Sequence, residues 1–265
     1  MEIQDVILIG TGRLSQFYAR HLPGLGLPIH QVYGRDPVKA GYVASLCGAD
    51  AVTQWQSLRK GASLYLVLVS DQSIPEVAGN LMLRDELLVH AAGSLPADIF
   101  SGLTDHYGVC WPLQTFSEGH YPDPADIPFI IEASNPLAER KLKAFASCLS
   151  SMVQTASFQE RQIMHLAAVF VSNFSNHLYA MAEELLATHR LPAHLLAPII
   201  RHTAARVGSQ PARQMQTGPA VRFDHAVLES QLSLLSSHPE WAEVYRLLTQ
   251  SIQDFANHPE PHEEL

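Results

Sequence analysis

A glycine-rich turn near the start of the chain has the residue types that bind a dinucleotide. Gly10, Thr11 and Gly12 follow four consecutive aliphatic residues and precede a segment whose apolar residues recur at helical spacing. In such a turn the first glycine permits a tight bend, and the second lets the backbone approach a pyrophosphate. The free N–H groups at the start of the following helix then bind that anion. We therefore expect Gly10, Thr11, Gly12, Arg13 and Leu14 to contact the cofactor.

The third position of this fingerprint departs from the usual pattern, because Ser15 stands in the place of a glycine. Serine is small enough for a position where a helix and a strand pack closely. The alternative is an ordinary turn between a strand and a helix, in a protein that has lost its cofactor. The turn alone leaves both interpretations open.

Arg35 indicates which dinucleotide is preferred. It follows the second expected strand, 29–33, at a place where an acidic residue would hold the ribose 2′-hydroxyl of NAD. An arginine there suits a 2′-phosphate, through charge-assisted hydrogen bonds of about 1.5–3 kcal/mol. We expect Gly34 and Arg35 to bind NADP(H), with NAD less favoured. Alternatively, Arg35 is a solvated turn residue and Asp36 is the ribose ligand.

Two further expected strands, 64–69 and 87–92, end in polar or small residues. Ser70 and Asp71 follow the first of them, and Gly93 follows the second. Ligands of open α/β sheets bind beyond the carboxyl ends of the strands, so we expect these three residues to face the cofactor. Asp71 is equally suited to cap the helix that opens near Ile74.

A long helix expected from about residue 158 carries the candidate catalytic residues. His165 could donate a proton as hydride reaches a substrate, because its reference pKa of about 6.5 suits acid–base work. Asn173 could orient a substrate carbonyl or the nicotinamide carboxamide. The alternative is that these side chains form hydrogen bonds with neighbouring helices and satisfy one another.

Four other residues are candidates for substrate binding: Gln114, Ser172, Thr217 and Arg222. Arg222 could bind a substrate carboxylate through two parallel hydrogen bonds. Pairing with Asp224, or simple exposure, explains Arg222 equally well.

The expected secondary structure changes near residue 156, from alternating strands and helices to helices alone. Buried strands alternate with helices before it, which predicts an α/β fold: an N-terminal Rossmann domain, 1–156, with a mostly parallel, doubly wound sheet. An all-helical domain of the dimerisation type is expected over 157–256, followed by a disordered tail, 257–265. The first helix has no Asp, Glu, Lys or Arg between Gln162 and Ala182, so we expect it to be buried nearly all round.

Composition excludes several classes of function. The net charge of -9 and the lack of any Lys/Arg run argue against a nucleic-acid partner. The 3 cysteines are far apart and the 14 histidines lack ligand spacing, so we expect neither a disulfide framework nor a metal site. No apolar run approaches the roughly 18 residues of a membrane span, and no signal peptide is evident, so we expect a cytoplasmic protein without a membrane partner.

Several stretches carry a family resemblance. They are Gly10–Gly12, Val69–Asp71, Trp111–Phe116, His165–Phe174 and Thr217–Pro219 with Arg222 and Asp224. With a Rossmann domain followed by a helical one, they resemble the 6-phosphogluconate dehydrogenase-like superfamily. Within it, the chain is similar to an uncharacterised bacterial Rossmann-like family whose helical C-terminal domain has no known function. That family is related to pyrroline-5-carboxylate reductase and the deazaflavin-linked NADP oxidoreductases. The resemblance implies a homodimer formed through the helical domain.

Two departures from the relatives limit the chemistry. Trp111 stands where members of the family commonly have histidine, and an indole either covers a nicotinamide ring or fills core, but cannot transfer a proton. The superfamily's β-hydroxyacid dehydrogenases have Lys-x-x-x-Asn on the long helix, whereas four residues before Asn173 this chain has Val169. A lysine-assisted reduction is therefore disfavoured, while imine reduction makes less demand on a side-chain acid.

Two functions follow as hypotheses. The first is an NADP(H)-dependent oxidoreductase that transfers hydride to or from a small carbonyl or imine compound in the cleft between the domains. The second is a sensor or scaffold that binds NADP(H) and catalyses nothing, which the loss of both the lysine and the histidine favours. No G-x-S-x-G, P-loop or H-E-x-x-H motif supports a hydrolase, P-loop or zinc-protease function.

Overall fold

The structure is a computed structural model that describes residues 3–81, 83, 85–117 and 119–257. The tail predicted over 257–265 lies outside the described residues, except for Asn257, which ends the last helix. The chain divides into two compact units, Met1–Phe174 and Ser175–Leu265. Each unit is described by itself.

The first unit is built on one sheet, as predicted from the alternation of strands and helices. Within the described residues the sheet has eight strands in the order β3-β2-β1-β4-β5-β6-β7-β8. All neighbouring strands are parallel except β6 and β7. The strands are β1 (Val6–Ile9), β2 (Ile29–Tyr33), β3 (Asp50–Val52), β4 (Leu64–Val67), β5 (Leu87–His90), β6 (Tyr107–Pro112), β7 (Phe129–Ala133) and β8 (Val153–Thr155).

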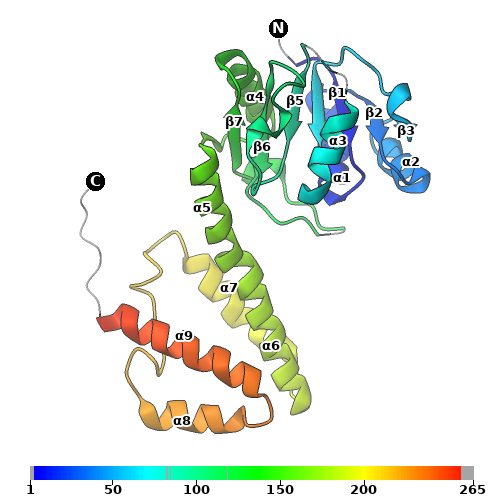
Figure 1. The fold of residues 1–265 in the computed structure, drawn as a ribbon. Coiled ribbons are helices and arrows are strands. Elements are labelled where there is room, and N and C mark those ends of the chain that lie inside the picture. The colour runs from blue at the N-terminus through cyan, green and yellow to red at the C-terminus, as the bar shows by residue number, and fades with distance from the viewer. Residues whose placement is uncertain (1–2, 82, 84, 118, 258–265) are drawn as a thin grey trace. The chain divides into compact units, whose positions relative to one another are not determined.

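Helices cover both faces of this sheet (Figure 1), which explains why its central strands are continuous aliphatic runs. In β1 the side chains of Val6 and Leu8 join the core on one face, and those of Ile7 and Ile9 join the core on the other. The first core contains residues of α1 (Arg13–His21), α2 (Pro37–Ser45) and α4 (Pro136–Leu149). The second contains residues of α3 (Ile74–Asn80) and of the short helix η4 (Ala97–Phe100).

The expected long helix is present, with one irregular turn. It consists of α5 (Phe158–Ala168), a π-helical turn over Val169–Phe174 and α6 (Ser175–Thr188). Its start is fixed by a capping box, in which Ser157 and Glu160 satisfy each other's backbone amides. The π turn adds a residue to the helical repeat and so shifts the phase of the side chains beyond it.

The expectation that this helix is buried nearly all round is wrong for the single chain. Ile163 is 69% exposed, Phe170 59% and Val171 76%. Among the described residues, the lack of charge between 162 and 182 therefore does not correspond to burial of these side chains within one chain.

The second unit is helical, as predicted. Its helices after α6 are α7 (Ala197–Arg206), α8 (His225–Leu234) and α9 (Pro239–Asn257). The predicted domain boundary at 156/157 stays a prediction: it lies between β8 and α5, whereas the two compact units meet within the long helical stretch. In the described part of the chain no helix is both long enough and apolar enough to cross a bilayer.

Candidate functional site

The glycine-rich turn lies at the point where the direction of the strand order reverses. β1 has β2 on one side and β4 on the other, and open α/β sheets bind ligands at this point, beyond the carboxyl ends of the strands. Gly10 has a φ of +128°, and a Cβ atom there would lie 2.4 Å from the carbonyl oxygen of Leu68. Only glycine fits this position, because both its backbone angle and its neighbour exclude a side chain.

The amino end of α1 is free to bind an anion. Gly12 is its N-cap residue and supplies no side chain, and the first turn contains no acidic residue. The first N–H groups of a helix have no partner within the helix, and they carry the positive end of its dipole. A phosphate group would satisfy these donors.

A cavity of about 240 Å³ adjoins this helix end. Its walls include the turn itself, the end of β2 and the segment after β4. Six of the predicted cofactor residues line the cavity together: Gly10, Thr11, Gly12, Gly34, Arg35 and Ser70. Gly34 allows the walls to come close, because a Cβ atom there would lie 2.4 Å from Cγ2 of Thr11.

An aromatic pair forms another wall of this cavity. Trp55, from the short helix η2 (Trp55–Ser57), stacks on Tyr33 at the end of β2, with ring centroids 3.7 Å apart and planes 23° apart. Desolvation by burial raises the pKa of Tyr33, so its hydroxyl is neutral at physiological pH. Glu76, from the first turn of α3, also lines the cavity.

Two acidic residues near the cavity have other partners. Asp36 caps α2: its Oδ1 accepts hydrogen bonds from the amides of Val38 and Lys39, at 2.9 and 3.2 Å. Asp71 does not cap α3, so that interpretation is wrong; the N-cap residue is Ser73, because the short helix η3 (Asp71–Ser73) precedes α3. The carboxylate of Asp71 instead accepts a hydrogen bond from the hydroxyl of Ser94.

Arg13 and Leu14, the other two residues predicted in this turn, use their side chains for contacts within the protein. Arg13 is exposed, and its Nη1 donates to the carbonyl oxygen of Phe116 at 3.4 Å. Leu14 is half-buried and packs against the core. For both residues the backbone amide, rather than the side chain, is the group suited to an anion.

Farther along the sheet, Trp111 brings two predicted residues, Gly93 and His165, into one cluster. Its indole is 8% exposed and packs in a small core; a Cβ atom on Gly93 would lie 2.8 Å from its Cε2. The half-buried ring of His165 meets the indole edge to face, with centroids 5.5 Å apart. Of the two roles considered for Trp111, the filling of core is the one that this packing supports.

The remaining candidates are more dispersed. Ser172 and Asn173 lie in the π-helical turn, half-buried and exposed respectively. Gln114 is exposed beyond β6, and its side chain accepts a hydrogen bond from the amide of Thr115 at 2.8 Å. Thr217 and Arg222 are exposed in the second unit.

Asp224, considered as a partner of Arg222, caps α8 by accepting a hydrogen bond from the amide of Val227 at 3.3 Å. Among the residues that the structure describes, no ion pair joins Asp224 to Arg222.

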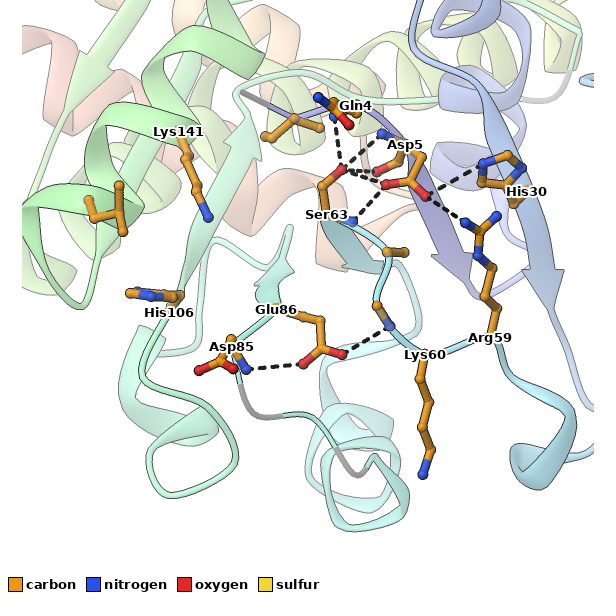
Figure 2. A pocket seen from close by; sticks show the side chains of 14 residues that line it. Gln4, Asp5, His30, Arg59, Lys60, Ser63, Asp85, Glu86, His106 and Lys141 are labelled. Atoms are coloured by element: carbon orange, nitrogen blue, oxygen red, sulfur yellow. Dashed lines mark hydrogen bonds and ion pairs between the residues drawn. The ribbon is translucent and has the colours of Figure 1, made fainter. Parts of the chain in front are cut away.

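A larger cavity, of about 1090 Å³, lies at the opposite, amino ends of the strands (Figure 2). Its charged groups balance, because three carboxylates face three permanent cations. The carboxylates belong to Asp5, Asp85 and Glu86, and the cations to Arg59, Lys60 and Lys141. It therefore has no net charge that would select a cofactor or an anionic substrate.

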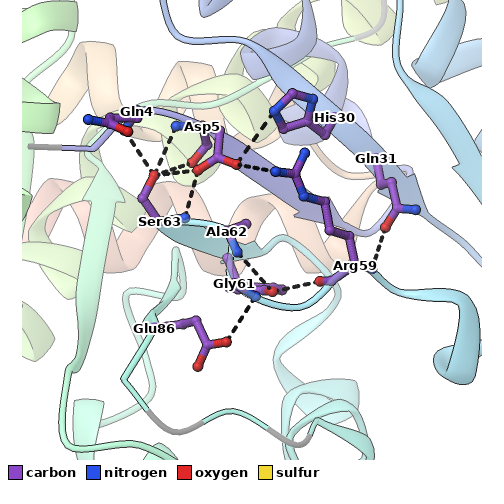
Figure 3. Close-up of polar contacts among 10 residues, drawn as sticks. Gln4, Asp5, His30, Gln31, Arg59, Gly61, Ala62, Ser63 and Glu86 are labelled. Carbon is purple, nitrogen blue, oxygen red and sulfur yellow. Dashed lines mark hydrogen bonds and ion pairs between the residues drawn. The ribbon is translucent and has the colours of Figure 1, made fainter.

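The polar groups around Asp5, at this amino end, bind one another (Figure 3). Asp5 accepts hydrogen bonds from the amide and hydroxyl of Ser63, at 2.7 and 2.6 Å, and pairs with His30 and Arg59 at 3.5 and 3.6 Å. Burial alone would raise the pKa of Asp5, but the Ser63 hydrogen bonds and the two nearby charges lower it overall. This network joins the starts of β1, β2 and β4, which is a structural role.

The sequence did not identify three residues of these clusters: Trp55, Glu76 and Ser94. Only Trp55 had a local signal, since a lone tryptophan follows the third strand. Within the described residues, no group of three or more His, Cys, Asp or Glu side chains is arranged to hold a metal ion.

Comparisons with known proteins agree with the fold. Residues 127–252 match a family described as Domain of unknown function (DUF2520). A provisionally assigned NADP oxidoreductase from Bacteroides fragilis is 39% identical, with a TM-score of 0.89 over 95% of this chain and 98% of that one. No protein among those with curated descriptions matches the chain.

Two more distant structures share the fold alone. An imine reductase from Myxococcus stipitatus, solved in complex with NADP+, is 17% identical, with a TM-score of 0.57 over 94% of this chain and 92% of that one. A 1-pyrroline-5-carboxylate reductase from Streptococcus pyogenes is 11% identical, with a TM-score of 0.60 over 94% and 98%. The DUF2520 match and the 39% identical structure confirm the resemblance to the Rossmann-like family that was inferred from the sequence motifs.

Proposed function

Because the chain belongs to the family of Rossmann-like proteins that contain a DUF2520 domain, we propose that it is an NADP(H)-dependent oxidoreductase. It would transfer hydride to or from a small carbonyl or imine compound. The observation that carries this proposal is the cavity at the uncapped amino end of α1, lined by Gly10, Gly12 and Arg35. The names of the relatives, an NADP oxidoreductase and an NADP+-bound imine reductase, support the same choice of cofactor.

Each wall of the cavity suits one part of this cofactor. The free amides of α1 fit a pyrophosphate, and the Arg35 guanidinium fits a 2′-phosphate through charge-assisted hydrogen bonds. The stacked pair of Trp55 and Tyr33 offers an aromatic surface next to Arg35 for the adenine ring. Among the described residues, Glu76 is the one acidic side chain in the lining, so Arg35 must outweigh it for NADP(H) to be preferred.

The bound cofactor would supply the hydride, and the protein would supply orientation and a proton. We propose His165 as the proton donor, because its ring is half-buried against Trp111 and retains an exposed part. Asn173 would orient the acceptor group, with Gln114 and Ser172 near the substrate. Thr217 and Arg222, in the second unit, stay sequence-based candidates for substrate contacts.

We also propose that the protein is a homodimer through its helical part. Large apolar side chains of the long helix, such as those of Ile163, Phe170 and Val171, are more than half exposed in one chain. A contiguous apolar surface of this kind is normally covered in solution. A second copy of the chain would cover it and would explain why no charges occur there.

A thermal-shift comparison of NADPH, NADH and buffer tests the cofactor proposal. NADPH at about a hundred times its Kd should stabilise the protein by about 2.7 kcal/mol, which raises Tm by about 5–10 °C. NADH should raise it less, because it lacks the 2′-phosphate. Equal stabilisation by the two nucleotides would contradict the role of Arg35, and no stabilisation by either would contradict the proposal.

Turnover then separates the enzyme from the sensor or scaffold. NADPH oxidation is followed with a panel of small aldehydes, ketones and cyclic imines. Consumption of NADPH with any of them supports the oxidoreductase. Tight NADPH binding without turnover on the whole panel would favour a protein that binds the nucleotide and catalyses nothing.

A further inference from the structure

The loop that follows β5, residues 91–96, is held in one conformation by a buried histidine. His90 is fully buried, and its Nδ1 accepts a hydrogen bond from the amide of Ala92 at 3.1 Å. Its Nε2 therefore carries the proton and donates to the carbonyl oxygen of Pro96 at 3.2 Å. Burial lowers the pKa of His90 to about 4, so this single-proton form persists at physiological pH. The two ends of the loop are thus tied to one ring.

A buried arginine holds the same loop from the other side. The side chain of Arg161, in the first turn of α5, is 0% exposed. Its guanidinium donates to the carbonyl oxygen of Leu95 and to the carboxylate of Glu132 on β7. One side chain therefore joins the loop, the sheet and the long helix. A buried charge is tolerated only when it is paired in this way.

The groups around the 91–96 loop lie near the carboxyl ends of β4, β5 and β6. Gly93, within the loop, packs under the indole of Trp111, and Ser94 donates to the carboxylate of Asp71 after β4. His165, one helical turn after Arg161, also contacts that indole. The loop and α5 therefore meet through Trp111, and Arg161 sets their register.

This cluster is placed where the second half of a dinucleotide would lie. The cavity with Arg35 is at β1 and β2, the side of the sheet for the adenosine half. β4 and β5 follow on the other side of β1, and a dinucleotide crosses the sheet at this reversal point. The nicotinamide half would then reach the loop after β5.

We propose that Arg161 is a positioning residue for the nicotinamide half of the cofactor. It fixes the 91–96 loop and the start of α5 relative to each other, so that Gly93, Ser94 and His165 are presented together. It contacts neither cofactor nor substrate itself, because its side chain is fully buried. This inference rests on the proposed function, since it presupposes that NADP(H) binds.

The test compares two ligands that differ in the nicotinamide half. NADP+ has it, whereas 2′,5′-ADP has only the phosphorylated adenosine half. Titration calorimetry is carried out on the wild type and on Arg161→Met, with Arg140→Met as the matched control at an exposed arginine of α4. Arg161→Met should weaken NADP+ binding about tenfold or more, which is about 1.4 kcal/mol, because the 91–96 loop is no longer held in place against α5. Its affinity for 2′,5′-ADP should stay within about twofold, since the adenosine wall is untouched.

An ion pair that only stabilised the fold would not weaken the binding of NADP+ while leaving the binding of 2′,5′-ADP unchanged. Equal weakening of both ligands, or no weakening of either, would overturn the inference. If Arg161→Met does not fold, the double variant Arg161→Met/Glu132→Gln removes the charge left unpaired on Glu132 and is judged by the same criterion. Arg161→Lys should restore part of the NADP+ affinity, because an ammonium group can pair with one of the two acceptors only.

Failure of the proposed function is distinguishable from failure of this inference. A wild type that binds neither ligand contradicts the proposed function, and the inference falls with it. A wild type that binds NADP+ more tightly than 2′,5′-ADP, with the same preference retained in Arg161→Met, contradicts the role of Arg161 alone.

Discussion

Replacing Gly12 by alanine separates the binding of the cofactor from the stability of the fold. Gly12 has an ordinary φ of -75°, and the nearest atom to a Cβ built there is the Leu68 carbonyl oxygen, 4.0 Å away. Alanine is a poorer N-cap than glycine, but it also reduces the freedom of the unfolded chain by about 0.4–1 kcal/mol. These effects oppose each other, so Tm should change by no more than about 4 °C.

The effect on binding should be much larger. Gly12 lines the cavity and begins α1, so the added methyl group occupies space into which a pyrophosphate must come to reach the helix amides. Losing one charge-assisted hydrogen bond costs about 1.5–3 kcal/mol, which weakens NADPH about ten- to hundredfold.

Gly10→Ala provides the contrasting variant. Gly10 has a φ of +128°, and a Cβ atom there would lie 2.4 Å from the carbonyl oxygen of Leu68. Alanine at this position therefore strains the backbone and displaces the chain at the end of β4. Strain alone costs about 1–3 kcal/mol, so this variant should lose stability as well as binding.

Calorimetric titration with NADPH and thermal melts of the three proteins measure both quantities. We expect Gly12→Ala to have a Tm close to that of the wild type and a much lower affinity for NADPH. If Gly12→Ala binds NADPH with wild-type affinity, the pyrophosphate does not approach this turn and the interpretation of the cavity is refuted.

Further predictions concern the cofactor phosphate, the acid, the amino-end network and the dimer. Arg35→Ala should weaken NADPH about ten- to hundredfold and leave NADH unchanged, with Lys39→Ala as an exposed control; equal losses for both nucleotides would refute the 2′-phosphate contact. His165→Ala should lower turnover about 10²–10⁴-fold while NADPH affinity is kept, and unchanged turnover would end its role as an acid. The lowered pKa of Asp5 means that its charged form stabilises the fold at neutral pH and that this contribution is lost as the pH falls. Asp5→Asn should therefore lower Tm at pH 7, and the difference should shrink below about pH 4; a difference independent of pH would count against the ionic network. Val171→Glu should convert a dimer into a monomer in analytical ultracentrifugation, and an unchanged dimer would place the interface elsewhere.

The sequence predicted the framework because each element had its own local signal. The strand 29–33 is found at the predicted residues. β1 is an aliphatic run because it is buried on both faces, and Gly10 ends it because no other residue fits there. Hydrophobic period and turn chemistry are properties of a few neighbouring residues, so they can be read without knowledge of the fold.

The contacts that complete the candidate site had no such signal. Arg161 donates to Leu95, 66 residues away, and to Glu132, 29 residues away. Trp55 stacks on Tyr33 only because β2 and β3 are neighbours in the sheet. Such pairs follow from the three-dimensional arrangement, and no spacing along the chain indicates them.

The long helix shows the limit of reasoning from composition. The absence of charge between residues 162 and 182 predicted burial, yet Val171 is 76% exposed in one chain. The prediction of burial was wrong for one chain, because composition does not say whether apolar side chains are covered by the same chain or by another one. The π-helical turn over Val169–Phe174 adds to this difficulty, since it breaks the regular repeat on which face assignments depend.

A crystal structure of the protein with NADPH tests the central claim most directly. We expect the pyrophosphate to bind the backbone amides of Gly12, Arg13 and Leu14. The 2′-phosphate should contact Arg35, and the nicotinamide should point toward the 91–96 loop. NADPH bound at another place, or a turn that stays empty at saturating NADPH, would contradict this claim.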